Sequence, residues 1–305
     1  MKLGLQIPSF TWPGGDAAIG ETFARIVRTA DEVGFDSIWV MDHFFQIRGV
    51  GPAEEPMLEG YGALHYAAAL TERARLGLMV GGVHYREPAL WVKAATTLDV
   101  LSGGRAWFGI GAGWNEDESR GLGFPFPTLR ERFERLEDTL RFAHDMWSGE
   151  HGTEAPLDGS HLHARRLLNS PQALSRPHPP ILVGGGGERR TLRLVARYAD
   201  ACNVFGGPDQ LRHKYAVLRE HCEIEGRDYN AIEKTNLSSF DVAITPGGPG
   251  STAGEMVDRF GALAEAGSQH TIFSIRGVDQ VKKLERIGRD VIPQVRGLGA
   301  PSPIA

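Results

Sequence analysis

Short apolar runs alternate with amphipathic helical patterns along this sequence. The first run covers 2–7, and the spacing of Phe23, Ile26 and Val27 predicts a first helix over 19–33. Further runs of strand length lie at 37–41, 74–80, 106–110, 181–183, 201–204, 237–244 and 271–275. Further helical patterns cover 58–72, 88–101, 129–147, 209–225, 252–266 and 278–291, and another follows the run at 181–183.

Eight strand–helix units in a chain of 305 residues predict an α/β fold, namely a (β/α)8 TIM barrel. The alternative is a doubly wound sheet, because alternation alone does not close a sheet. No linker divides the chain, so 1–305 is expected to form a single domain. An irregular segment near 150–180 is predicted to be an insertion that covers one barrel end as a lid. The tail after Val295 is expected to be poorly ordered.

Composition restricts the possible partners. Apolar residues make up 41% of the chain and charged residues 23%, which is ordinary for a globular protein. No stretch is apolar enough to predict a membrane span, and a net charge of −5 without a long basic run argues against nucleic acid. Two cysteines, Cys202 and Cys222, form no disulfide framework, which favours a reducing cytoplasm. The expected partner is a small organic molecule.

Four consecutive glycines, 184–187, separate the run at 181–183 from a helical pattern. Glycines allow a ligand to approach the backbone closely, and the helix that follows offers free N–H groups and a positive dipole end. Arg189 and Arg190 add charge suited to phosphate or carboxylate. A third glycine of the dinucleotide fingerprint would fall at Arg189, so we interpret the segment as a phosphate loop late in a barrel. A simple loose turn is the alternative.

Chemistry in such a barrel lies at the carboxyl ends of the strands. His43 follows the second strand and is the best candidate for proton transfer. Asp42 precedes it, and because neighbours on a strand point to opposite sides, Asp42 is a candidate for binding a polar edge of the ligand. The pair Gly81-Gly82 suggests a bulge or a close approach to a flat ligand. Asn115 and the acidic residues after it are interpreted as caps of a short helix.

The set of strand-end residues is aromatic, rich in glycine and sparsely charged. This suits a planar, mostly apolar ring with a phosphorylated tail. His161 and His163 are two residues apart, but no third ligand of firm spacing appears, so no metal site is expected.

Four segments, which together span much of 34–203, resemble the bacterial luciferase-like superfamily. The resemblance is to its branch of deazaflavin (coenzyme F420)-dependent oxidoreductases from actinobacteria, and it extends from Lys2 to about Phe205. The segments are GFDSIWVMDHF, YREPALWVKAATTLDVLSGGRAWFGIGAGWNEDE, FPFPTLRERFERLEDTL and PPILVGGGGERRTLRLVARYADACN. A homodimer is also expected from this resemblance.

The resemblance implies coenzyme F420 as cofactor, with FMN as the alternative, and it assigns positions to the site. The ring would lie against a non-proline cis peptide near Met79, Val80 and Gly81. Many relatives carry a threonine where this chain has Gly81. The other implied cofactor-binding residues are Asp42, Ala112, Gly113, Trp114, Asn115, Gly185, Gly186, Gly187, Glu188 and Arg189.

The resulting hypothesis is an F420-dependent oxidoreductase that moves a hydride between C5 of the coenzyme and an unidentified organic substrate. His43 would supply or accept the proton, and the substrate would lie among Trp12, His43, Phe44 and Trp114. Three alternatives stay open. They are a luciferase-like monooxygenase that uses reduced FMN and oxygen, a non-catalytic flavin-binding protein, and a sugar-phosphate enzyme, which should need more acid and base groups at the strand ends.

Overall fold

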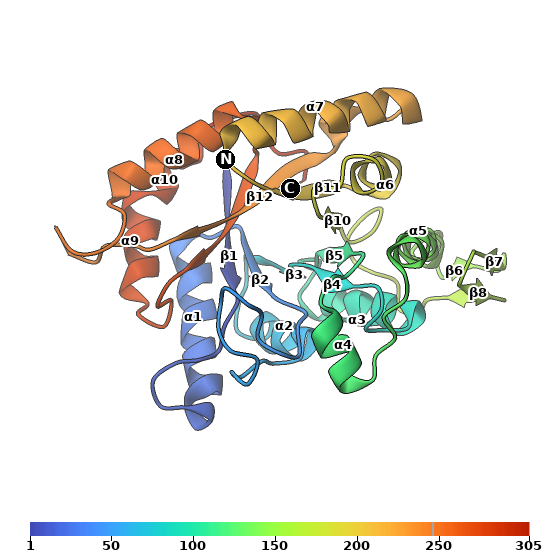
Figure 1. Cartoon of the computed structure of the whole chain (residues 1–305), viewed down its shortest axis with the longest axis horizontal. Coiled ribbons are helices and arrows are strands. Elements are labelled where there is room, and N and C mark those ends of the chain that lie inside the picture. Colours follow the sequence, from blue (N-terminus) through green and yellow to red (C-terminus); the bar gives the residue numbers. More distant parts are fainter. Residues whose placement is uncertain (246, 305) are drawn as a thin grey trace.

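The computed structural model describes residues 1–245 and 247–304, and a parallel sheet lies at its centre (Figure 1). The sheet order is β3-β2-β1-β13-β12-β11-β10-β5-β4, and every pair in it is parallel. The strands are β1 (Lys2–Ile7), β2 (Ser37–Val40), β3 (Arg75–Leu78), β4 (Gly81–Gly82), β5 (Phe108–Gly111), β10 (Ile181–Gly184), β11 (Ala201–Phe205), β12 (Glu233–Phe240) and β13 (His270–Ile275).

The sheet closes between its first and last members. β4 begins three residues after β3 ends, so the two together occupy one barrel position. Leu76 of β3 pairs with Ala106, just before β5. Here the Leu76 N–H donates to the Arg105 carbonyl at 2.8 Å and the Trp107 N–H donates to the Leu76 carbonyl at 2.7 Å. The strands therefore fill eight positions, and the predicted (β/α)8 barrel is confirmed.

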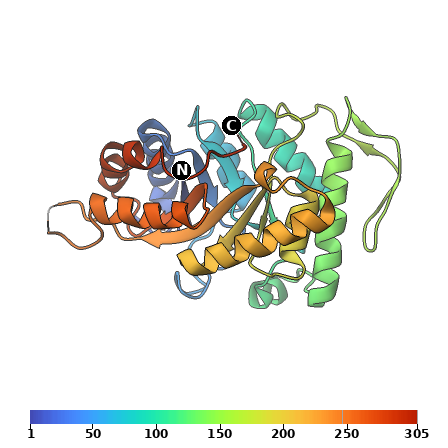
Figure 2. The same cartoon turned by 90° about the horizontal axis from the view of Figure 1, so that it is seen from above.

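Helices cover the outside of the barrel (Figure 2). They are α1 (Ile19–Val33), α2 (Gly60–Ala68), α3 (Pro88–Leu101), α4 (Glu116–Leu122), α5 (Leu129–Met146), α6 (Thr191–Tyr198), α7 (Pro208–Glu225), α8 (Ala253–Glu265), α9 (Lys282–Asp290) and α10 (Ile292–Val295). Two 3-10 turns lie at Asp16–Ala18 and Tyr229–Ala231. In the described part of the chain, no helix combines the length and the apolar character needed to cross a bilayer.

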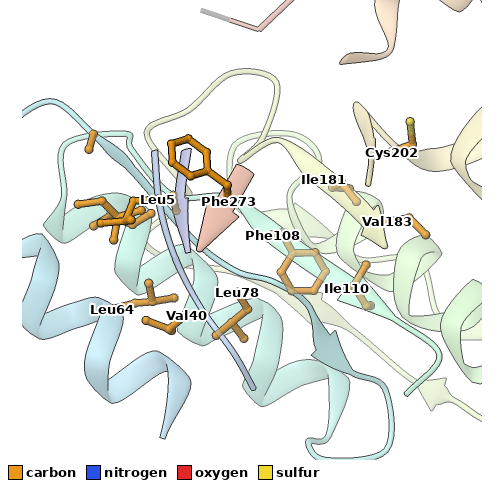
Figure 3. Close-up of a cluster of buried hydrophobic side chains, with 14 of the residues drawn as sticks. Leu5, Val40, Leu64, Leu78, Phe108, Ile110, Ile181, Val183, Cys202 and Phe273 are labelled. Atoms are coloured by element: carbon orange, nitrogen blue, oxygen red, sulfur yellow. The ribbon is translucent and has the colours of Figure 1, made fainter. Parts of the chain in front are cut away.

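Alternate strand residues fill two separate cores. The larger core lies between strands and helices and holds such residues as Leu5, Val40 and Phe108 (Figure 3). The smaller core lies inside the barrel and is built from Trp39, Met79, Trp107, Leu182, Ala201 and Ile272. Because successive strand side chains point to opposite faces, both cores arise from the same short runs.

Several predicted boundaries are wrong. The helix predicted over 58–72 ends at Ala68, the seventh strand covers Glu233–Phe240 instead of 237–244, and the last long helix begins at Lys282 instead of 278. The missed strand residues are polar but buried, and side chains pair with them: Asn203 Nδ2 donates to Thr235 Oγ1 at 2.8 Å, and Ser268 Oγ donates to Asn236 Oδ1 at 2.6 Å. Buried polar residues give no apolar run, which is why the pattern missed them.

The insertion forms two short antiparallel pairs, β6 (Gly152–Thr153) with β9 (Leu167–Leu168) and β7 (Leu157–Asp158) with β8 (His163–Ala164). Both views place these hairpins at the outer edge of the molecule beside α5 (Figures 1 and 2). Further on, the Leu174 and Ser175 N–H groups donate to Asp99 of α3 at 2.7 and 2.8 Å. The insertion therefore runs along the outside of α3 and α5.

The described part of the carboxyl-terminal tail, 296–304, packs against the amino-terminal end of the barrel, so the expectation that the tail is poorly ordered is wrong for these residues; residue 305 lies outside the described chain. The Met1 ammonium donates to the Leu298 carbonyl at 2.7 Å. Lys2 Nζ donates to the Ile304 carbonyl, and Ile304 packs against the interior core. The opposite end of the barrel, where the strands finish, is the end that carries the candidate site.

Candidate active site

A cavity of about 380 Å³, here named the central cavity, lies at the carboxyl ends of the strands. The ends of β2, β3, β5, β10, β11 and β12 contribute to its wall, together with β4 and the amino-terminal halves of α5 and α6. Most of the predicted site residues meet here. They are His43, Met79, Val80, Gly81, Ala112, Gly113, Trp114, Gly185, Gly186 and Gly187.

Four other predicted residues do not line the central cavity. Asp42 is buried behind Gly81, where its Oδ2 accepts from Arg86 Nη1 at 2.6 Å and from the Gly82 N–H at 3.3 Å. Asn115 is the N-cap residue of α4. Glu188 faces outward and pairs with Lys214 Nζ at 2.6 Å. The fourth, Arg189, lines an arginine-rich hollow. This hollow adjoins the central cavity, because Phe133 lines both of them.

Several other expectations need correction. Trp12 and Phe44, which were expected around the substrate, do not line the cavity. Trp12 packs on Phe10 with ring centroids 5.6 Å apart, and Phe44 packs edge-on against Tyr85 at 5.4 Å. No residue of the 150–180 insertion lines it either, so the prediction that the insertion is a lid over the site is wrong.

A non-proline cis peptide joins Met79 and Val80, as the resemblance implied. Glycines on neighbouring strands make room for this segment. A Cβ on Gly109 would lie 1.9 Å from the Leu78 carbonyl oxygen, and one on Gly184 would lie 2.8 Å from both Val80 methyl groups. A Cβ on Gly81 would lie 2.2 Å from Trp91 Cζ2, so the threonine of many relatives does not fit this packing.

The glycine loop leaves backbone donors unused. Gly185 has φ +122°, a conformation that favours glycine, and its N–H donates to the Asn203 carbonyl at 2.9 Å. Within the described residues, the N–H groups of Gly186 and Gly187 donate no hydrogen bond. A Cβ on Gly186 would meet nothing nearer than Lys214 Cε, at 3.7 Å. The loop thus presents free donors in front of α6, which is an arrangement that suits a phosphate.

His43 is held by a buried carboxylate that the sequence analysis did not select. His43 Nδ1 lies 2.6 Å from Glu118 Oε1, and Glu118 of α4 is fully buried. The backbone N–H groups of Phe44 and Phe45 donate to Glu118 Oε2 at 2.8 and 3.1 Å. The Tyr85 hydroxyl donates to Oε1. Four donors therefore converge on one carboxylate and fix the loop that carries His43.

The protonation of this cluster follows from these contacts. Burial alone would raise the pKa of Glu118, but the hydrogen bonds from His43 and Tyr85 outweigh burial and lower it. Burial and then Glu118 raise the pKa of Tyr85, which keeps its hydroxyl a donor. An ionised carboxylate only accepts, so Nδ1 of His43 carries the proton. Nε2 is then the ring nitrogen left to exchange a proton with a substrate.

Two side chains that can exchange protons, His43 and Tyr85, line the described part of the cavity wall, and the Tyr85 hydroxyl is already bonded to Glu118. Neither lysine, arginine nor a carboxylate lines the described wall. His84 lies behind Gly113, where its Nε2 bonds Ser119 Oγ at 2.9 Å. Burial, and then Arg132, lower the pKa of His84 to about 4, so it stays neutral. The site thus offers a single proton-transfer group beside an aromatic and glycine-rich wall.

A second cavity of about 600 Å³, here named the side cavity, opens beside the first. Phe205 and Leu237 belong to the walls of both. The remainder of its wall comes from β1, β13, the loop after β2, the start of α7 and the middle of α8. The sequence analysis did not predict it, because it depends on which strands become neighbours when the barrel closes.

Comparison with known proteins decides the family. Residues 1–247 match the luciferase-like monooxygenase family. The chain belongs to the luciferase-like monooxygenase family. One relative is the F420-dependent glucose-6-phosphate dehydrogenase of Kineococcus radiotolerans, 34% identical over 213 residues, which cover 68% of this chain and 59% of that protein. The enzyme of the same name from Beutenbergia cavernae is 28% identical over 270 residues, which cover 88% of this chain and 75% of that protein.

Two solved structures share the fold. The coenzyme F420-dependent tetrahydromethanopterin reductase of Methanopyrus kandleri has a TM-score of 0.79 at 16% identity, with 96% of this chain and 99% of that chain covered. An F420-dependent secondary alcohol dehydrogenase, solved with an F420–acetone adduct, has a TM-score of 0.80 at 17% identity, with 97% and 99% covered. At such identities these likenesses establish the fold alone.

Proposed function

We propose that this chain is an oxidoreductase that depends on coenzyme F420 and moves a hydride between C5 of the coenzyme and an organic substrate. The observation that carries the proposal is the Glu118–His43 pair at the edge of the central cavity, because His43 is the residue of the described wall whose ring nitrogen is left to exchange a proton. The names of the curated relatives in the family, which are F420-dependent dehydrogenases, support the choice of coenzyme.

The residues present fit a flavin-like group. The unused N–H groups of Gly186 and Gly187, in front of α6, suit its phosphate. The segments 79–81 and 112–114 would hold the ring, because both line the cavity with backbone, small side chains and one indole. Arg189 lies beside the loop and suits an anionic tail. When bound, the deazaflavin supplies a carbon that accepts or releases hydride.

The chain's own groups handle the proton that balances the hydride. In the oxidising direction the substrate loses a hydride and a proton, and Nε2 of His43 takes the proton. The buried carboxylate of Glu118 stabilises the imidazolium that results, and the Tyr85 hydroxyl keeps that carboxylate in place. In the reducing direction the same imidazolium returns the proton.

Binding experiments test the choice of coenzyme. The purified protein is titrated with F420 and, separately, with FMN, each oxidised and reduced. We expect tight binding of F420. Tight binding of FMN alone would overturn the proposal and favour a monooxygenase, which is then recognised by oxygen consumption.

A variant tests the role of His43. We expect His43→Ala to bind F420 with wild-type affinity and to lose turnover by about 100-fold or more, the usual contribution of a general base. The matched control is His163→Ala, because His163 is exposed on the insertion and pairs with Asp158 at 2.5 Å. Full activity of the His43 variant would leave this histidine with a structural role only, and would favour a flavin-binding protein without turnover.

A further inference from the structure

The side cavity shares its inner wall with the central cavity but is not needed to hold the coenzyme. Phe205 and Leu237 form the shared wall, so a molecule in the side cavity lies next to whatever fills the central one. Its volume of about 600 Å³ is in the range of small-molecule sites. Its lining therefore indicates what kind of molecule meets the coenzyme.

The lining is apolar with a few neutral polar groups. Met41, Ile47 and Val50 follow β2 in the chain, and together with Phe205 and Leu237 they give the cavity an apolar lining. The polar contributions are those of Gln6 and three serines, all uncharged. Such a wall favours an apolar molecule that carries one or two hydrogen-bonding groups.

A single charged side chain, Arg259 of α8, belongs to the described lining. Its guanidinium is already engaged: Nη2 donates to Ser238 Oγ at 2.9 Å, Nη1 donates to the Ser239 carbonyl at 3.3 Å, and the group lies 4.2 Å from the centre of the Phe240 ring. A phosphate dianion is usually bound by several charged or backbone donors together. One arginine with neutral partners does not supply them.

The helix that begins at this cavity, α7, does not supply the donors for a phosphate either. α7 starts at Pro208, which has no N–H, and the Gly207 N–H donates to Gln210 Oε1 at 3.3 Å. Asp209 adds a negative charge in the first turn. The amino-terminal end of α7 is therefore less favourable to an anion than the glycine loop in front of α6.

We infer that the side cavity holds the body of the substrate, with its reacting carbon at the shared wall next to the central cavity, and that the substrate is a largely apolar alcohol, or the matching carbonyl compound, without a phosphate group. This inference rests on the proposed function. The alcohol gives up its carbinol hydrogen as hydride to the coenzyme and its hydroxyl proton to Nε2 of His43, which leaves a ketone or aldehyde. One base suffices for this reaction, which agrees with the single histidine of the central cavity.

Binding to the coenzyme-free protein is the first test, because it does not depend on turnover. Saturation-transfer NMR is recorded with a series of secondary alcohols from 2-propanol to 2-octanol and with glucose 6-phosphate. We expect the affinity to rise about fourfold with each added methylene group, which corresponds to about 0.8 kcal/mol. The glycine loop of the coenzyme-free protein can accept a phosphate, so glucose 6-phosphate is tested by competition, and we expect it not to displace 2-octanol. Displacement of 2-octanol by glucose 6-phosphate would overturn the inference.

A substitution places the binding in this cavity. Val50 is 43% exposed and lines the side cavity but not the central one. We expect Val50→Ser to weaken 2-octanol binding by about threefold to tenfold and to leave the Kd for F420 unchanged. Leu101→Ser is the control, because Leu101 is exposed at the far end of α3 and lines neither cavity. Equal effects of the two variants would refute the assignment of the cavity.

Turnover separates the two proposals. With F420 present, we expect kcat/KM for the longer alcohols to exceed that for glucose 6-phosphate. If F420 binds and glucose 6-phosphate is the better substrate, the inference about the substrate is wrong and the proposed function stands. If F420 does not bind at all, the proposed function is wrong, and the alcohol titrations with the coenzyme-free protein still report on the cavity.

Discussion

Replacement of Glu118 by glutamine tests how the site orients its base. The change preserves the shape of the side chain but converts an acceptor-only group into one with an oxygen and an NH₂. The Phe44 and Phe45 N–H groups need an acceptor, so the amide oxygen will face them. The NH₂ then faces His43 and donates to Nδ1. The proton of the neutral ring moves to Nε2, and His43 can no longer accept a proton from the substrate.

The magnitude follows from the bonds that are lost. A hydrogen bond to a charged partner contributes about 1.5–3 kcal/mol, which corresponds to about 10- to 150-fold in rate. We therefore expect kcat of Glu118→Gln to fall by that factor in both directions of the reaction. Glu118 is behind the wall and contacts His43 rather than the cavity, so the Kd for F420 should stay the same. This separation of kcat from coenzyme affinity distinguishes a positioning residue from a binding residue.

Steady-state kinetics, coenzyme titration and thermal unfolding are measured on the same preparations. Glu116→Gln is the matched control, since Glu116 lies on the same helix, is exposed and pairs with Arg120 at 2.7 Å. The Tyr85 hydroxyl and Nδ1 lose a charged acceptor in Glu118→Gln, so its Tm should also fall, by about 2–4 °C for each kcal/mol. If kcat stays within about threefold of the Glu116 variant, the orienting role of Glu118 is refuted.

Three further results are expected. Gly186→Val should weaken F420 binding by at least about tenfold, or 1.4 kcal/mol, without lowering Tm, because a Cβ at Gly186 meets no packed atom; unchanged affinity would remove the phosphate loop assignment. Ile304→Ala should lower Tm by several degrees and leave F420 affinity intact, because Ile304 packs at the opposite end of the barrel; a wild-type Tm would contradict that packing. Burial raises the pKa of Asp31, but the backbone N–H groups of Ala74, Glu72 and Arg73 outweigh burial and lower this pKa. The ionised Asp31 carboxylate therefore stabilises the fold fully above about pH 4, and this stabilisation is lost as acid protonates the carboxylate. Asp31→Asn should therefore lower Tm at pH 7 and flatten its decline below pH 4; parallel melting curves against pH would refute this.

The barrel was predictable because its strands are apolar on the face that packs against helices. The run 2–7 supplies Leu3, Leu5 and Ile7 to the outer core, and the predicted and observed bounds of this strand agree. The start of β12 was predicted four residues too late, because its first residues are polar and bond to side chains from other parts of the chain. Such pairs join residues far apart in sequence, as Asn203 and Thr235 show, so no local pattern reveals them.

The site was predictable where the fold alone determines position. His43, Gly113 and Gly186 follow strands, and every strand end of a parallel barrel meets at the same mouth. Glu118 was missed because it lies on a helix, in a run of three acidic residues that also suits a helix start. Its neighbours Glu116 and Asp117 are exposed acidic residues of the first helical turn. Glu118 is buried because α4 packs against the loop after β2, whose N–H groups donate to its carboxylate.

The two cavities make different demands on the chain. The central cavity is walled by glycines, and Gly109, Gly111 and Gly184 leave no space for a side chain without displacing β3 or Val80. The side cavity is walled by side chains from several strands and helices and from the loop after β2, which contributes Ile47 and the exposed Val50. Substitutions in the first wall should therefore cost coenzyme binding or the fold. Substitutions in the second can change the preferred alcohol while the coenzyme and His43 stay in place, so substrate range is the property of this chain that sequence change alters most easily.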